Sequence, residues 1–251
     1  DGEDRGYFDV ELAGCVRSSQ QYLRNTAVVE TRLEAADGAA VRILDFCPRF
    51  RQFDRMFHPM MIVRIVEVAA GRPRVRVRMR PRQRYGETEY AVRRGSHHLR
   101  YIGDALDLRL TTNTSLDYIV EERWFALEDP LTLVLGPDES IAESVDGLGA
   151  RFLASTTDYW RDWVRTLAVP FEWQEPVIRA AITLKLCSYE DTGAIVAALT
   201  TSIPEAPGSE RNWDYRFCWL RDSLFTVKAL NRLGATRTME RYLGYILNVV
   251  A

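Results

Sequence analysis

The sequence has few of the residues that build metal sites and disulfide frameworks. It contains three histidines, and its four cysteines lie far apart with no Cys-x-x-Cys pair: Cys15, Cys47, Cys187 and Cys218. Structural zinc sites need closely spaced ligands, and disulfide-stabilised domains need a dense cysteine pattern. The adjacent His97 and His98 follow Gly95 in an expected turn without another ligand nearby, which indicates a surface position. We therefore expect no metal centre, no disulfide framework and no cofactor.

The chain also lacks an excess of charge of one sign and any long apolar run. Its formal net charge is -2, which favours neither a nucleic acid nor an anionic membrane as partner. No apolar run reaches about 18 residues, and no signal peptide opens the chain. With 47% hydrophobic and 27% charged residues, the composition is typical of a soluble globular protein. We expect a cytoplasmic protein that binds neither nucleic acid nor membrane.

The usual signals at the two ends of a chain are missing. The sequence does not begin with Met, and it ends inside an apolar helical pattern at residues 249–251 without Gly, Asn or Pro to stop the helix. We expect a piece of a longer polypeptide. Its 251 residues are enough for one large domain or two ordinary ones.

Residues 1–150 carry β-strand signals. Short β-branched or alternating runs occur at residues 28–33, 41–46, 60–68, 106–110, 118–125 and 131–135. Asp37-Gly38, between the first two runs, is typical of a hairpin turn. Short strands at this spacing predict an antiparallel β-sandwich domain.

One of these strands carries a stripe of arginines. Residues 74–80 read Arg-Val-Arg-Val-Arg-Met-Arg, which places Val and Met on one face and Arg on the other. Such a stripe fits a nucleic-acid surface, or the solvated face of a sheet whose arginines pair with acids on neighbouring strands. We favour the second interpretation, because the stripe has no interleaved aromatics and the chain has no basic excess.

The remaining residues carry helical patterns. Thr-Thr-Asp at 156–158 predicts the cap of a linker helix, within residues 151–170, that docks on the sandwich. Glu175-Pro176 predicts the start of a helix that runs to about residue 189. Residues 202–209 form a loop by composition, and a helix over residues 223–233 ends at Gly234. A last apolar stripe leads to the end of the chain.

The stretch at residues 210–223, Glu-Arg-Asn-Trp-Asp-Tyr-Arg-Phe-Cys-Trp-Leu-Arg-Asp-Ser, combines four aromatics with three arginines and three acids. Aromatic faces stack on sugar rings, while Arg and Asp offer donors and acceptors to hydroxyls. The mixture fits a polyol-binding wall. It equally fits a buried aromatic cluster whose Arg and Asp side chains pair with each other.

Three motifs resemble glycoside hydrolase family 15, which includes glucoamylases, glucodextranases and bacterial and mycobacterial trehalases. They are Tyr-Glu-Asp-Thr-Gly-Ala-Ile-Val-Ala-Ala at 189–198, Thr-Thr-Ser-Ile-Pro-Glu at 200–205 and Arg-Asn-Trp-Asp-Tyr-Arg-Phe-Cys-Trp-Leu-Arg-Asp at 211–222. Asp-Phe-Cys-Pro at 45–48 resembles a segment of the N-terminal sandwich of prokaryotic members. The resemblance implies a super-β-sandwich followed by an (α/α)6 barrel, of which residues 171–251 would supply only the first helices.

The resemblance also implies an activity and site residues. The family hydrolyses α-glucosides from the chain end with inversion at the anomeric carbon. Tyr215 would pack against the terminal glucose, Trp219 would line the pocket, and Arg221 and Asp222 would hydrogen-bond the sugar hydroxyls. Asp222 also lies where an N-cap of the helix over residues 223–233 is expected, and one carboxylate could fill both roles.

The resemblance places no catalytic residue in this chain. Inverting hydrolysis needs an acid and a base roughly 6.5–9.5 Å apart. Residue types alone would nominate Asp214 and Asp222 as that pair. In the family both groups are glutamates on later barrel loops, which we expect beyond Ala251. The 251-residue chain should therefore be inactive, whereas a longer polypeptide should hydrolyse trehalose or a short α-glucan.

Two alternatives stay open. The chain could be a non-catalytic carbohydrate-binding or interaction module, or part of a phosphorylase-like enzyme, although it has no Gly-rich phosphate loop. The apolar faces of its last three helices would be exposed without barrel partners, so we expect aggregation or packing on neighbouring chains, a homo-oligomer included.

Overall fold

The computed structural model describes residues 6–199, 206 and 208–250. The chain divides into two compact units, Asp1–Tyr159 and Trp160–Ala251, and the boundary lies inside helix α2 (Val145–Arg165). The helix begins before the 151–170 segment that we predicted as the linker. The division into a sandwich domain at 1–150, a linker helix and a barrel start at 171–251 stays a prediction.

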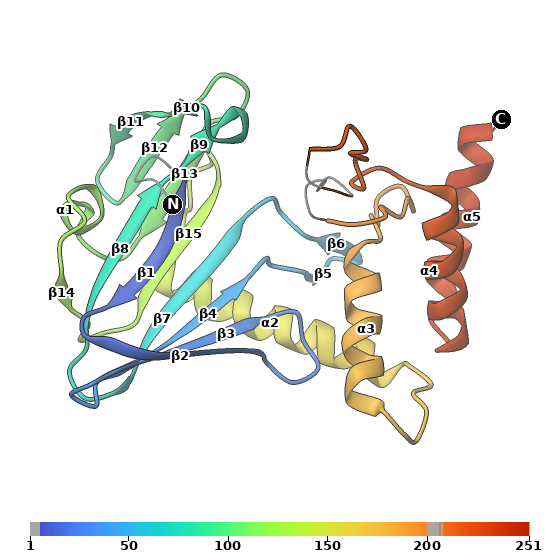
Figure 1. Cartoon of the computed structure of the whole chain (residues 1–251), viewed down its shortest axis with the longest axis horizontal. Helices are drawn as coiled ribbons and strands as arrows, with labels where there is room; N and C mark the ends of the chain where they lie inside the picture. Colours follow the sequence, from blue (N-terminus) through green and yellow to red (C-terminus); the bar gives the residue numbers. More distant parts are fainter. Residues whose placement is uncertain (1–5, 200–205, 207, 251) are drawn as a thin grey trace. The chain divides into compact units, whose positions relative to one another are not determined.

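The first unit contains two main antiparallel sheets (Figure 1). The larger has the order β11-β12-β13-β15-β7-β4-β3-β2, and the smaller has the order β1-β8-β14. The strands of the larger sheet are β2 (Cys15–Tyr22), β3 (Val29–Ala35), β4 (Ala40–Phe46), β7 (Ile62–Ala70), β11 (Ala91–Arg94), β12 (His98–Ile102), β13 (Leu108–Thr112) and β15 (Leu131–Pro137). Those of the smaller are β1 (Tyr7–Leu12), β8 (Arg74–Arg80) and β14 (Phe125–Ala126).

Short elements complete this unit. Two small hairpins pair β5 (Phe50–Gln52) with β6 (Arg55–Phe57), and β9 (Arg82–Gln83) with β10 (Thr88–Glu89). A 3-10 turn η1 (Arg84–Gly86) and a short helix α1 (Leu116–Val120) lie in the connections.

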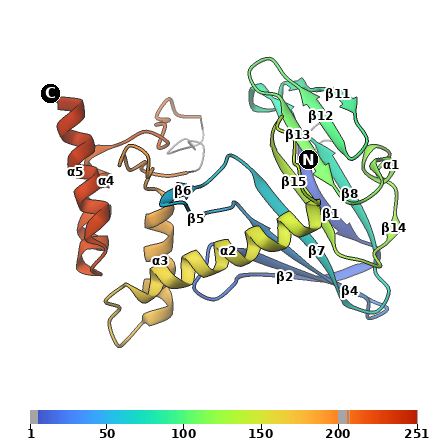
Figure 2. The same ribbon diagram turned by 180° about the vertical axis from the view of Figure 1, so that it is seen from behind.

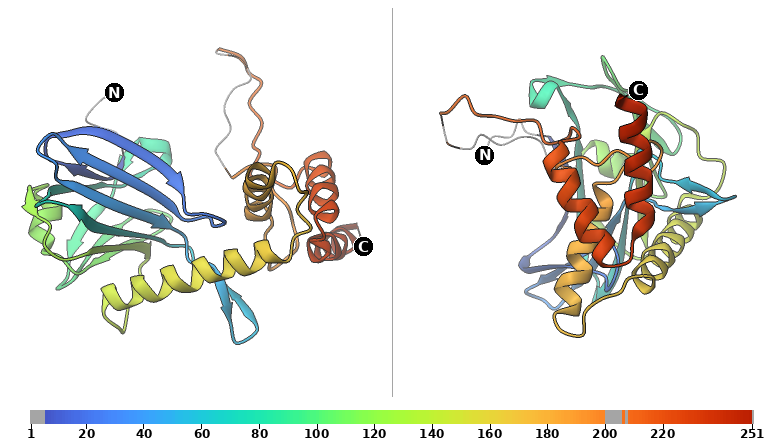
Figure 3. Two further views of the ribbon diagram at one scale, coloured as in Figure 1. Left: turned by 90° about the horizontal axis from the view of Figure 1, so that it is seen from below. Right: turned by 90° about the vertical axis from the view of Figure 1, so that its right-hand side faces the viewer.

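The two faces of the large sheet bury different partners. On one face, Val41 and Val66 share a core with Val75 and Val77 of β8, so the two sheets form a β-sandwich. On the other face, Leu44, Val63 and Val134 pack with Val145, Leu148 and Phe152 of α2. Figures 2 and 3 show this part of α2 lying along the sheet. Strands β4, β7 and β15 are therefore covered on both sides, which explains why each places apolar residues on both faces.

The predicted hairpin at Asp37-Gly38 is confirmed. Strands β3 and β4 pair in antiparallel register, from Val29 opposite Asp45 to Glu34 opposite Ala40. Gly38 has φ +87°, a backbone conformation that other residues rarely adopt, and Asp37 Oδ1 accepts a hydrogen bond from the Ala39 amide at 2.9 Å.

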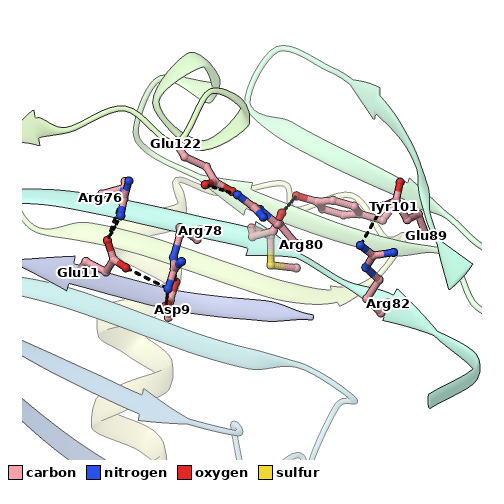
Figure 4. Close-up of polar contacts among 10 residues, drawn as sticks. Asp9, Glu11, Arg76, Arg78, Arg80, Arg82, Glu89, Tyr101 and Glu122 are labelled. Carbon is pink, nitrogen blue, oxygen red and sulfur yellow. Dashed lines mark hydrogen bonds and ion pairs between the residues drawn. The ribbon is translucent and has the colours of Figure 1, made fainter. Parts of the chain in front are cut away.

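The arginine stripe of β8 pairs with acids, as predicted (Figure 4). Arg78 contacts Asp9 at 2.6 Å and Glu11 at 2.9 Å, and Arg76 also binds Glu11, both acids being on the adjacent strand β1. Arg80 donates to Glu122 at 2.7 Å. Val75, Val77 and Met79 are buried on the opposite face. The stripe is thus an outer face of the sandwich on which Arg76, Arg78 and Arg80 form ion pairs.

Sequence reasoning missed the aromatic side chains that cover this stripe. The guanidinium of Arg78 lies 4.4 Å from the ring centre of Tyr7, and that of Arg76 lies 4.8 Å from the ring of Trp124. Both rings come from segments outside β8, so the alternation within residues 74–80 gave no sign of them. Such cation–π contacts add to the ion pairs.

Two predicted elements of this unit are wrong. Residues 118–125 do not form a strand: helix α1 occupies Leu116–Val120, because Ser115 caps it by accepting the Asp117 amide, and only Phe125 belongs to a strand. Thr156–Asp158 do not cap a helix but lie inside α2. The Thr156 hydroxyl instead accepts the Arg49 amide at 3.1 Å.

The second unit contains the C-terminal part of α2 and three further helices, α3 (Gln174–Leu186), α4 (Leu220–Arg232) and α5 (Thr236–Val250). Helices α4 and α5 pack side by side and are joined at Gly234, whose φ of +80° ends α4 as predicted (Figure 3). Ile182, Ile195 and Leu230 are fully buried. These helices do not define a barrel, and the (α/α)6 barrel stays a prediction.

Some predictions fall on residues that the structure does not describe. The Thr-Thr-Ser-Ile-Pro-Glu motif at 200–205, most of the predicted loop at 202–209 and the terminal Ala251 are among them. Within the described ranges, no helix is both long and apolar enough to cross a membrane, and no cluster of His, Cys, Asp and Glu could hold a metal ion.

Candidate functional site

Two of the three family-like motifs lie side by side in the second unit. The amide of Ala198 donates to the Tyr215 carbonyl at 2.7 Å, and the amide of Ala197 donates to the Phe217 carbonyl at 3.1 Å. Farther along, the Ser223 hydroxyl donates to the Ile195 carbonyl at 3.1 Å. The irregular segment that precedes α4 is thus fastened to residues 197–198 at two points, and the first turn of α4 is fastened to Ile195 at a third.

The first motif forms a tight turn between α3 and this segment. The Gly193 amide donates to the Tyr189 carbonyl at 2.8 Å, and the Tyr189 amide donates to the Ala194 carbonyl at 2.8 Å. Gly193 has φ +86°, and a Cβ added there would lie 2.3 Å from the carbonyl oxygen of Arg241 on α5. Only glycine allows the turn to approach α5 this closely.

A buried ion pair supports the same turn. Lys185 of α3 binds Glu190, and the two side chains are 9% and 5% exposed. Arg241 Nη1 also donates to the Glu190 carbonyl at 3.5 Å. Because buried charges must be paired, the pair fixes the first motif to the end of α3.

The aromatic side chains of the second motif gather around Trp219. The ring of Tyr215 lies 5.9 Å from that of Trp219 at an interplanar angle of 46°, and Trp213 meets Trp219 edge-on at 6.2 Å. Trp213 remains 46% exposed. The cluster therefore presents aromatic surface to solvent, as a sugar-stacking wall requires, while its members contact one another.

Asp214 organises this segment from within. Its carboxylate accepts the Arg216 backbone amide at 2.9 Å and the Arg216 guanidinium at 2.7 and 3.0 Å. Its backbone carbonyl accepts the indole N–H of Trp219 at 2.9 Å. The hydrogen bonds from Arg216 lower the pKa of Asp214 to about 2, so this carboxylate is ionised at neutral pH and cannot act as a general acid there.

Arg221 and Asp222 occupy the first turn of α4. The predicted cap at Asp222 is wrong: the helix begins at Leu220, three residues earlier than expected, and Trp219 holds the N-cap position without a side-chain cap. Asp222 instead lies in the first turn, where a negative charge is favoured by the helix dipole.

The Asp222 carboxylate has unused hydrogen-bonding capacity. Its Oδ2 is buried, yet it has no hydrogen-bond partner among the residues that the structure describes. Arg221 Nε lies 3.8 Å from this oxygen, which is within ion-pair range but too long for a hydrogen bond. An unsatisfied carboxylate oxygen is costly unless a ligand or another part of the protein supplies a donor.

The structure thus brings Tyr215 and Trp219 into ring contact and places Arg221 and Asp222 in the turn of helix that directly follows. It also adds residues that sequence reasoning missed. Ser223 is fully buried and contacts Cys218 Sγ at 3.4 Å, and Cys218 in turn raises the pKa of Tyr245 on α5. The Asp214–Arg216 ion pair agrees with the alternative interpretation of this stretch, in which its Arg and Asp side chains pair with each other.

Comparisons with known proteins show which proteins the chain is similar to. The sequence profile of Glycosyl hydrolases family 15 matches residues 174–250. Trehalase of Thermoplasma acidophilum is 27% identical over 237 residues, covering 92% of this chain and 40% of that protein. Trehalase of Mycobacterium tuberculosis is 44% identical over 95 residues, covering 38% of this chain and 14% of that protein. Trehalase 1 of Sulfolobus acidocaldarius is 40% identical over 96 residues, covering 38% and 16%.

No solved structure matches the chain significantly. The chain spans 40% of the length of the trehalases from Thermoplasma acidophilum and Thermoplasma volcanium. The matched family segment begins at α3 and ends with α5, so it contains both motifs that the structure brings together. Residues 174–250 are therefore similar to glycosyl hydrolases family 15, the family that the motifs at 189–198 and 211–222 resemble.

Proposed function

We propose that this chain carries the glucosyl-binding part of an inverting, exo-acting α-glucoside hydrolase that releases glucose from trehalose or a short α-glucan. The observation that carries the proposal is the buried Oδ2 of Asp222, which lacks a donor among the described residues and follows directly on the Tyr215–Trp219 aromatic pair. A sugar would supply both a hydroxyl donor and an apolar ring face.

The aromatic rings and the charged first turn of α4 would bind different parts of the sugar. The faces of Tyr215 and Trp219 would stack on the C–H face of the terminal glucose. Asp222 would accept hydroxyl hydrogen bonds and Arg221, which is largely exposed, would donate them. Charged partners make stronger hydrogen bonds than neutral ones, so a sugar with the wrong hydroxyl pattern would leave them unpaired and bind weakly.

Trehalose is the first substrate to test, because all the relatives named above are trehalases. Maltose and short α-glucans remain the second class, since they end in the same glucosyl unit. We further propose that the 251-residue chain releases no glucose. Asp214 is held ionised by Arg216, so it does not supply the acid of an inverting pair, and the resemblance places the catalytic glutamates elsewhere.

Calorimetric titration of the 251-residue chain with trehalose, maltose and sucrose tests the proposal. We expect saturable binding of a glucosyl-terminated sugar, weakened on the order of tenfold to a hundredfold in Asp222→Ala. Asp162→Asn, which alters an exposed ion pair on α2, should bind as the unmodified chain does. Equal affinity of the unmodified chain and Asp222→Ala would refute the binding role.

An assay for glucose release separates the catalytic part of the proposal. The 251-residue chain should produce no glucose from trehalose above the buffer rate. A longer polypeptide that includes this chain should produce equal amounts of α- and β-glucose from trehalose, because only the attacked anomeric carbon inverts. Asp222→Ala should remove most of its turnover. If the longer polypeptide binds sugar without hydrolysis, the non-catalytic binding module is the better description.

A further inference from the structure

We propose that Asp214 is a positioning residue for the sugar site: its side chain closes a turn over Arg216 that fixes the indole of Trp219 and the ring of Tyr215. The inference rests on the proposed sugar-binding function and assigns Asp214 a task that the family resemblance does not give it. Asp214 would not touch the sugar. It would act through the aromatic residues on either side of it.

Asp214 forms hydrogen bonds through both its carboxylate and its backbone carbonyl. The carboxylate binds the Arg216 side chain through two nitrogens and the Arg216 backbone amide through Oδ1. The carboxylate therefore holds residues 214–216 in one backbone conformation, with Tyr215 at its centre. A turn fixed in this way sets the direction of the Asp214 carbonyl, and that carbonyl accepts the Trp219 indole N–H at 2.9 Å.

The far side of the turn is anchored as well. The Tyr215 carbonyl accepts the Ala198 amide at 2.7 Å, so the turn has a fixed attachment to the first motif. Between these two anchors the Tyr215 and Trp219 rings lie 5.9 Å apart. An aromatic stacking wall binds best when its rings are held in place before the sugar arrives, because the ordering cost is then already met.

The charge of Asp214 serves the clamp rather than proton transfer. An ionised carboxylate accepts a two-point contact from a guanidinium, which fixes the geometry more tightly than a single neutral hydrogen bond. The low pKa of Asp214 is a consequence of that contact. Asn at this position would keep one acceptor for the Arg216 amide and lose the charge. Ala would lose every side-chain hydrogen bond to Arg216.

Asp214→Asn and Asp214→Ala in the 251-residue chain test the inference with two measurements. The first is the indole 15N–1H resonance of Trp219, assigned by its loss in Trp219→Phe, which reports the hydrogen bond without any sugar. The second is the calorimetric affinity for trehalose. We expect the resonance to move toward the position of a water-exposed indole and the affinity to fall about tenfold in the Ala variant, with a smaller change in the Asn variant.

Asp162→Asn, which breaks an exposed Asp–Arg pair of α2, is the matched control and should change neither measurement. Circular dichroism and the melting temperature show whether Asp214→Ala is folded. If it is not, the two measurements on Asp214→Asn test the inference. An unmoved Trp219 resonance in a folded Asp214→Ala would overturn the inference. If the unmodified chain binds no sugar, the proposed function falls, and the Trp219 resonance still decides whether Asp214 holds the cluster.

Discussion

At the scale of single residues, Gly193 has the least room for a side chain among the described glycines of the second unit. Its backbone has φ +86°, and a Cβ would meet the main-chain oxygen of Arg241 rather than the end of a flexible side chain. A turn that lies this close to a helix can yield only by moving the helix or the turn itself. The glycine of the family-like Asp-Thr-Gly sequence is thus also required for a steric reason, since a side chain does not fit there.

Gly193→Ala is expected to lower the free energy of unfolding by roughly 3 kcal/mol or more, since left-handed strain of about 1–2 kcal/mol adds to a main-chain clash. Urea unfolding monitored by circular dichroism measures the change. Gly208→Ala is the matched control, because Gly208 has φ +74° but nothing within 4 Å of its added Cβ. Equal losses in the two variants would show that the approach to Arg241 is unimportant.

The Lys185–Glu190 pair is the other sensitive point. Lys185→Met leaves the buried Glu190 carboxylate without its lysine and should destabilise the chain by roughly 3–5 kcal/mol. The same substitution at Arg165, whose pair with Asp162 is exposed, should change stability by less than about 1 kcal/mol. Urea unfolding compares the two, and a similar small effect for both would contradict the structural role of the buried pair.

Single residues also explain where sequence reasoning stopped short at the site. The resemblance named Tyr215, Trp219, Arg221 and Asp222, and it could not reveal that Asp214 clamps Arg216, because hydrogen bonds to main-chain groups depend on the backbone path. The prediction of an N-cap at Asp222 was wrong because α4 begins earlier, at Leu220. An aromatic residue, Trp219, stands at the N-cap, and no propensity rule favours it there.

At the scale of elements, period-two alternation was the most reliable signal. It predicted β8 with its bounds and with the burial of Val75, Val77 and Met79. It failed at residues 118–125, where the local hydrogen bond from the Asp117 amide to Ser115 starts a helix within an apolar run. The start of α2 was also missed, because its first turns are held by packing on the sheet through Val145 and Leu148.

The arginine stripe gives a prediction at this scale. Arg78→Gln should lower stability by about 1 kcal/mol, because Arg78 binds both Asp9 and Glu11 of β1. A double-mutant cycle with Asp9→Asn should give a coupling of about 0.5–1 kcal/mol that shrinks in high salt. Arg93→Gln on the edge strand β11 is the control, because Arg93 forms no ion pair with the residues that the structure describes. A zero coupling would mean that the stripe is held by stacking on Tyr7 rather than by charge.

At the scale of the whole molecule, helices α4 and α5 expose apolar side chains. Leu220 and Leu224 of α4 and Leu243, Leu247 and Val250 of α5 are all about half exposed or more. Solvated apolar surface of this kind is uncommon in stable monomers and marks an interaction face. The apolar stripes in the sequence of these helices predict such faces.

We expect the 251-residue chain to self-associate through this surface as its concentration rises. Light scattering coupled to size-exclusion chromatography should show a mass that increases with loading, and Leu243→Gln with Leu247→Gln should reduce the increase. Val16→Gln with Val92→Gln, which alters exposed valines on strands β2 and β11, is the control. A monomer at all concentrations would exclude the surface as a self-association site.

The sandwich has a consequence for the order in which the chain opens. Strands β4, β7 and β15 lie between two cores, whereas β2 is exposed along its whole length. The amide protons of β4, β7 and β15 should exchange with deuterium only on global unfolding, because both covering layers protect these strands. The amide protons of β2 should exchange through local fraying. In a time course followed by mass spectrometry, the peptides that take up deuterium last should therefore come from the middle of the large sheet.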